Sequence, residues 1–159
     1  MPTSRQLHGY SYEKVSLLGM PHIGAAYDLG SYRTTGSYHS TGMRCAICGA
    51  MANNCHHVVP RRVLKTFELE TPKGDFLLRS PLHLLCGTGV SGHHGAYHSG
   101  ILKAKWVWDT EEDERMWWDG TLLSQMPPHS PELFRHGHYE VEDLRRGVTI
   151  RLGATQSRF

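Results

Sequence analysis

Three short stretches hold most of the side chains that could bind a metal ion: CAIC at residues 45–48, NNCHHVVPRR at 53–62 and CGTGVSGHHGAYH at 86–98. They contain all 4 cysteines of the chain and five of its 12 histidines. Thiolate and imidazole are ligands that zinc prefers, and a Cys-x-x-Cys pair supplies half of a tetrahedral site. The stretches therefore predict a zinc site and leave histidines for a second metal ion.

The Cys-x-x-Cys pair needs two more ligands to close a zinc site. The next candidates along the chain are Cys55, Cys86 and His93. Two disulfides would be another use of four cysteines, but a Cys-x-x-Cys pair with many histidines nearby is more typical of metal binding in a reducing compartment.

The remaining histidines predict the second site. His56 and His57 are adjacent, so at the end of an extended strand their side chains point to opposite sides, and one can hold a metal while the other faces a water. His94 and His98 are four residues apart and share one face if that segment is helical, as two ligands of one ion would require.

This order of parts resembles the HNH endonucleases, the ββα-metal or His-Me finger nucleases, in the zinc-bearing form common in phage genomes. The resemblance covers residues 43–105. In that family a Cys-x-x-Cys knuckle precedes a strand that ends in Asp-His or His-His and a Pro-Arg turn, and the segment from His56 to Arg61 has this order. The family's Leu-Cys, glycine-rich turn and Cys-His-Gly correspond to the segment from Leu85 to Gly95, where His93 replaces the cysteine.

The resemblance implies an α+β fold with a small ββα-metal core, a structural zinc knuckle and irregular terminal extensions. The expected organisation is an N-terminal arm over 1–42, the nuclease core over 43–105, and a C-terminal extension over 106–159 that packs on the core.

Turn residues and apolar runs predict the elements inside this frame. Strands over 55–59 and 76–78 are expected to form the core hairpin, and a helix is expected over 93–105. The tryptophans of 106–108 and 117–118 are expected on two strands around an acidic loop, with a last strand over 148–152.

The resemblance also implies roles for side chains. His57 would be the general base, because an imidazole with an ordinary pKa of about 6.5 can take a proton at neutral pH. Arg61, or its neighbour Arg62, would hold a phosphate with its guanidinium. The ligand sets would be Cys45, Cys48, Cys86 and His93 for a structural Zn²⁺, with Cys55 as the alternative to His93, and His56, His94 and His98 for the catalytic divalent ion, with a water as the alternative to His98.

One letter of the family motif is missing, because no asparagine stands shortly before Leu85-Cys86. Ser80 or His83 could replace it. The imidazole ligands favour Mn²⁺, Co²⁺ or Ni²⁺ over Mg²⁺, which prefers oxygen ligands.

The charge pattern points to a polyanionic partner. From residue 44 to 105 the chain has eight Lys or Arg and three acidic residues, a balance of +5, whereas 109–119 has six acidic residues and one Arg, a balance of −5. We expect DNA as the partner, with RNA not excluded, phage packaging proteins as further partners, and a monomer or homodimer.

No apolar run approaches the roughly 20 residues of a membrane span, and no signal peptide is readable, so a cytoplasmic location is expected, in the host if the gene is phage-encoded. The expected function is that of a metal-dependent HNH endonuclease that hydrolyses DNA phosphodiester bonds. The alternative is a zinc-stabilised nucleic-acid-binding module on a catalytically impaired HNH scaffold.

Overall fold

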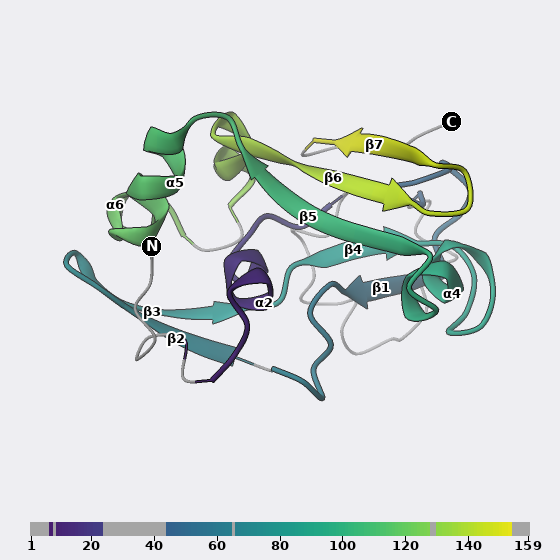
Figure 1. The fold of residues 1–159 in the computed structure, drawn as a ribbon, viewed down its shortest axis with the longest axis horizontal. Coiled ribbons are helices and arrows are strands. Elements are labelled where there is room, and N and C mark those ends of the chain that lie inside the picture. The colour runs from purple at the N-terminus through teal and green to yellow at the C-terminus, as the bar shows by residue number, and fades with distance from the viewer. Residues whose placement is uncertain (1–6, 8, 24–43, 65, 128–129, 154–159) are drawn as a thin grey trace.

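The computed structural model describes residues 7, 9–23, 44–64, 66–127 and 130–153, which form a mixed α+β fold with small antiparallel sheets (Figure 1). In chain order the helices and strands are α2 (Tyr12–Leu17), β1 (Asn54–His57), β2 (Thr66–Thr71), β3 (Gly74–Arg79), β4 (Leu82–Leu85), α4 (Gly92–His98), β5 (Leu102–Trp108), α5 (Glu111–Trp118), α6 (Thr121–Gln125), the 3-10 helix η2 (Pro131–Arg135), β6 (Gly137–Asp143) and β7 (Val148–Leu152).

The sheet of β1 and β4 lies beside α4 at one end of the molecule (Figure 1). The two strands are antiparallel, with His56 opposite His83. All four residues of β4 are buried, and Ile23 forms a parallel bridge to His83. An apolar strand covered on both faces suits this central position.

The partner of the histidine strand differs from the sequence prediction. We expected residues 55–59 to pair with 76–78, but β1 pairs with β4, and β3 pairs with β2 in a separate hairpin. Pro72 and Lys73 close that hairpin locally, and Phe67 and Leu69 alternate with exposed residues along β2, as expected for a half-buried strand. The β2–β3 hairpin is therefore inserted between the two strands of the site.

The helix predicted over 93–105 is shorter than expected, because α4 ends at His98. Gly100 follows with a φ of +80°, a conformation that breaks the helix and that glycine adopts without strain. From Leu102 the exposed Lys103 and Lys105 alternate with more buried residues, which is the period of a strand. This segment is β5, the edge strand of the three-stranded sheet β5-β6-β7.

The prediction of two tryptophan strands is also half wrong. Trp106 and Trp108 lie in β5, but Trp117 and Trp118 lie on α5 and are buried. Thr110 caps this helix, and its first turn is entirely acidic, an arrangement that the helix dipole stabilises. The acidic segment is thus a helix start, at the opposite end of the molecule from α4 (Figure 1). The strand predicted over 148–152 is present as β7.

The N-terminal region contributes to the main core. Val15 of α2, together with Leu18, Met20 and Ile23, is fully buried in the same apolar cluster as Trp117. Most of the segment predicted as an arm, 24–42 included, lies outside the described residues.

All four cysteines are free thiols, so the disulfide alternative does not apply. Within the described ranges, no helix has the length and apolar character needed to cross a membrane.

Candidate metal centres and the groove between them

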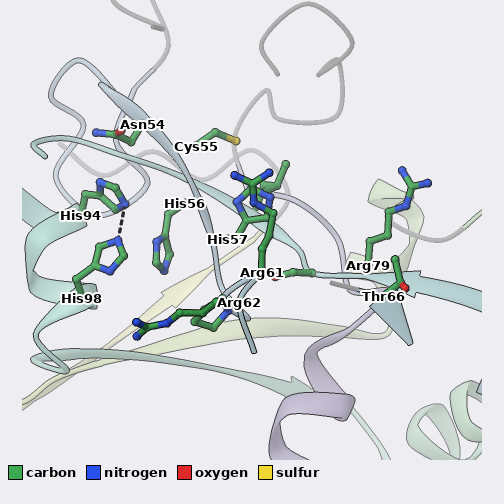
Figure 2. Close-up of a pocket in the computed structure, with 13 residues that line it drawn as sticks. Asn54, Cys55, His56, His57, Arg61, Arg62, Thr66, Arg79, His94 and His98 are labelled. Carbon is green, nitrogen blue, oxygen red and sulfur yellow. Dashed lines mark hydrogen bonds between the residues drawn. The ribbon is translucent and has the colours of Figure 1, made fainter. Parts of the chain in front are cut away.

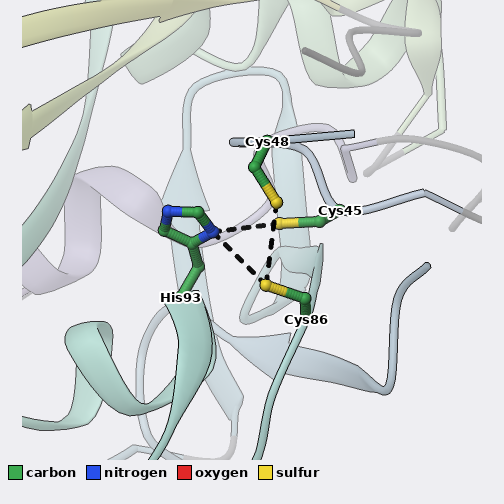
Figure 3. Close-up of side chains that lie close together, drawn as sticks. All are labelled: Cys45, Cys48, Cys86 and His93. Atoms are coloured by element: carbon green, nitrogen blue, oxygen red, sulfur yellow. Dashed lines mark hydrogen bonds between the residues drawn. The ribbon is translucent and has the colours of Figure 1, made fainter. Parts of the chain in front are cut away.

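The first centre consists of Cys45, Cys48, Cys86 and His93, whose ligand atoms all lie within 4.8 Å of one another (Figure 3). Two of the cysteines lie on the turn at 45–48, Cys86 follows β4 directly, and His93 is in the first turn of α4. Two segments of the chain, 45–48 and 86–93, thus meet at one point.

The distances in this cluster suit a tetrahedral zinc ion. Cys48 Sγ and Cys86 Sγ are 3.7 Å apart, and His93 Nδ1 is 3.6 Å from Cys45 Sγ and 3.3 Å from Cys86 Sγ. In a tetrahedral site with normal zinc–ligand distances, two sulfur ligands lie about 3.8 Å from each other. A sulfur and a nitrogen ligand lie about 3.6 Å from each other. Burial raises the pKa of the Cys45 thiol to about 12, so a thiolate at this position needs a cation beside it. The donor set fits a Cys3His zinc site.

Two asparagine side chains hold the loop that carries Cys86 and His93. Asn53 Oδ1 accepts a hydrogen bond from the Gly87 amide at 2.7 Å, and Asn54 Nδ2 donates to the Gly87 carbonyl. Gly92 has a φ of +63°, and a Cβ added there would lie 2.7 Å from the Cys86 carbonyl oxygen. The sequence alone does not predict a role for either asparagine, since such side-chain contacts follow only from the fold.

The second centre consists of His56 on β1 with His94 and His98 on α4, again with nitrogens within 4.8 Å of one another. His94 Nε2 and His98 Nε2 are 3.0 Å apart (Figure 2). That is a hydrogen-bonding distance, and it is also the separation of about 3.0 Å between two nitrogens bound at right angles to one ion at about 2.1 Å. The residues present fit a three-histidine metal site, and the i, i+4 spacing on α4 brings two of its ligands to one face.

Burial keeps His56 and His94 in the protonation state that a metal ligand needs. Burial, together with the neighbouring His94, His98 and His57, lowers the pKa of His56 to about 3. The pKa of His94 is also lowered, by burial and by His98. Both imidazoles are therefore neutral at neutral pH and have a lone pair available.

An open groove of about 870 Å³ runs past the three histidines (Figure 2). His57 lines it, with Arg61, Arg62 and Arg79, and no Asp or Glu is among the described residues of its wall. In Figure 2 His94 and His98 are at one side of the view and Arg79 is at the other, with His57 and Arg61 between them. The groove is thus lined by His57, by the three-histidine cluster and by three guanidinium groups. The guanidinium groups make its wall positively charged.

The two residues that could replace the missing asparagine of the family motif, Ser80 and His83, lie in different places. Ser80 lines the groove, and its Oγ accepts a hydrogen bond of 2.7 Å from the backbone N–H of Val59, two residues after His57. His83 lies on β4 opposite His56 and is fully buried, with its ring centroid 4.6 Å from that of Tyr139. Ser80 is therefore the side chain that fixes the turn after the histidine strand.

The two candidates for the fourth zinc ligand, His93 and Cys55, also lie in different places. His93 is in the Cys3His cluster, whereas Cys55 lines the groove. Cys55 packs instead against a small apolar cluster of Ala52, Leu82 and Leu84.

Comparisons with protein-family models, with curated proteins and with solved structures give no match to this chain. The two metal-ligand clusters and the groove are therefore the basis for a functional conclusion.

Proposed function

We propose that this protein is a metal-dependent endonuclease of the HNH type that hydrolyses phosphodiester bonds of DNA. One observation carries the proposal: a histidine that does not belong to either ligand cluster, His57, lines the same groove as the three-histidine cluster and three arginines. A base, a metal site and phosphate-binding groups are the components that such a hydrolysis requires.

The order of elements supports the family assignment. Strand β1 carries His56 and His57, the antiparallel β4 follows, and α4 supplies His94 and His98. This is the order strand, strand, helix on which the ββα-metal nucleases build their site. The Cys3His cluster ties α4 to the end of β4, which is the place of the structural zinc in the zinc-bearing members.

In the proposed reaction His57 removes a proton from a water molecule as the water oxygen forms a bond to phosphorus. The bond from phosphorus to the 3′-oxygen breaks, and that oxygen takes up a proton from a solvent water to become a hydroxyl. Arg61, or Arg62 beside it, donates guanidinium hydrogen bonds to the phosphate oxygens and holds the strand in the groove. Ser80 acts through the Val59 amide and keeps the turn that follows His57 in place.

His56, His94 and His98 would hold the divalent ion. When bound, it would supply positive charge to a nonbridging phosphate oxygen and to the departing 3′-oxygen.

The test is incubation of the zinc-loaded protein with supercoiled plasmid and a series of divalent ions. Wild-type protein should convert the plasmid to nicked or linear DNA. His57→Ala should lower the rate by about 10²–10⁴-fold, with its zinc content and its unfolding temperature unchanged.

The rival function, a zinc-stabilised binding module, gives another result in the same assay. Such a protein binds the plasmid and retains zinc, but no ion in the series supports cleavage. That outcome would overturn the enzyme proposal.

A further inference from the structure

The groove extends beyond the region where hydrolysis is proposed. Its far wall comes from the inserted β2–β3 hairpin, in which Thr66 and Arg79 are directly paired across the two strands. In Figure 2 both side chains lie well away from His94 and His98. The hairpin therefore adds a separate part of the wall, which β1, β4 and α4 do not supply.

The guanidinium of Arg79 is free to accept an anionic partner. Arg79 is exposed, and no carboxylate in the described part of the chain forms an ion pair with it. Arg115 on α5 shows the opposite situation, since it is bound to Glu112 and, at 3.1 Å, to Asp119. Donors that no protein acceptor uses remain available for phosphate oxygens.

The backbone that carries Arg79 is fixed. Its carbonyl accepts a hydrogen bond of 2.9 Å from the Gly19 amide, and its neighbours Leu78 and Ser80 are buried. A cationic side chain on a rigid strand can hold a ligand at a defined distance from the histidines.

We propose that Arg79 and the hydroxyl of Thr66 form a second phosphate-binding subsite, which holds the polynucleotide backbone away from the phosphate that is cut. The inference rests on the proposed nuclease function. No Phe, Tyr or Trp is among the described residues of the groove wall, so this wall offers no platform on which unpaired bases could stack. The subsite therefore contacts the backbone of a DNA duplex and contributes affinity without sequence preference.

The experiment measures DNA binding separately from cleavage. A fluorescein-labelled DNA duplex of two helical turns is titrated with zinc-loaded protein in the His57→Ala background, at several salt concentrations. Adding Arg79→Ala should weaken binding about tenfold and reduce the slope of log affinity against log salt by about one, the effect of losing one phosphate contact.

Two further variants make the result specific. Arg79→Lys should recover the salt slope, because it restores the charge. Arg151→Ala removes another exposed arginine, from β7 and outside the groove, and should leave both affinity and slope close to those of the parent. The subsite is wrong if Arg79→Ala binds like the parent, or if Arg151→Ala weakens binding as much as Arg79→Ala does.

This binding result is independent of whether the plasmid is cut. Absence of cleavage by wild-type protein would overturn the proposed function while the duplex titration still reports on Arg79. Normal cleavage with no effect of Arg79→Ala on binding would overturn the subsite alone.

Discussion

His56 and His57 are neighbours in the chain, yet their surroundings give them different chemistry. His56 is buried against His94 and His98, and burial lowers its pKa to about 3. His57 is half-buried and lines the groove on the side of Arg61 (Figure 2). A strand turns consecutive side chains in opposite directions, so one strand end can supply both a metal ligand and a base.

The three-histidine set leads to a prediction about metal preference. Cleavage should be faster with Mn²⁺, Co²⁺ or Ni²⁺ than with Mg²⁺, because imidazole nitrogens suit the first three ions and Mg²⁺ prefers oxygen ligands. The measurement is the initial rate of plasmid nicking at matched ion concentrations. A rate with Mg²⁺ equal to or above the others would contradict this ligand assignment.

Ser80 should contribute to both stability and activity. Ser80→Ala leaves the N–H of Val59, a residue that is only 1% exposed, without its acceptor, and should lower the free energy of unfolding by about 1–3 kcal/mol. The rate of cleavage should also fall, because the turn after His57 loses its anchor.

Urea unfolding and plasmid nicking test this prediction together. Ser124→Ala is the matched control, since Ser124 is exposed and its hydroxyl donates a hydrogen bond to the Thr121 carbonyl within α6. If both alanine variants behave like the wild type, Ser80 has no positioning role.

At the scale of the element, the N-terminus of α5 depends on a small polar network. Asp113 accepts hydrogen bonds from the Thr110 hydroxyl and from His136 Nδ1, each at 2.7 Å. Burial acts to raise the pKa of Asp113, but the bonds from His136 and Thr110 outweigh it and leave the pKa below its ordinary value of 3.8. This network links the start of α5 to His136, the residue directly before β6.

Because the pKa of Asp113 is lowered in the folded protein, the direction in which its contribution to stability changes with pH is defined. The Asp113 carboxylate stabilises the fold above the unfolded-state pKa of 3.8, and this contribution is lost as the pH falls through the folded-state pKa. Asp113→Asn should therefore cost about 1 kcal/mol at neutral pH, and the difference from wild type should shrink at the acid end. Urea unfolding across the pH range measures it, with the exposed Glu111→Gln as a control for charge at the same helix end. A difference that stays constant with pH would show that ionisation of Asp113 is not responsible.

At the scale of the molecule, the Cys3His cluster joins the turn at 45–48, the end of β4 and the start of α4. Structural zinc sites contribute about 10–16 kcal/mol of apparent binding free energy in small domains, as much as the usual total stability of a domain. We therefore expect Cys48→Ser, or removal of zinc by a chelator, to lower the unfolding temperature by more than about 10 °C.

Cys55→Ser is the matched control for this experiment. Cys55 lies outside the cluster, so the variant should keep one equivalent of zinc and unfold near the wild-type temperature. Loss of zinc in Cys55→Ser, or its retention in Cys48→Ser, would show that the ligand set is wrong.

The sequence alone determined the features that depend on residues close to one another in the chain. Spacing alone brought His94 and His98 to one helical face, the Pro72-Lys73 turn marked a strand on its C-terminal side, and the residues after Gly147 form the predicted last strand, β7. The sequence also singled out the two sets of ligand side chains, because soft and imidazole donors at these spacings have few other uses.

Contacts between distant residues were decided only by the tertiary structure. Which strand pairs with β1, whether His93 or Cys55 completes the Cys3His cluster, and that Ser80 reaches Val59 all depend on segments brought together from different parts of the chain. The physical reason is that strand pairing and side-chain contact are set by how the apolar surfaces of the whole chain are buried together. Local propensity does not encode that arrangement.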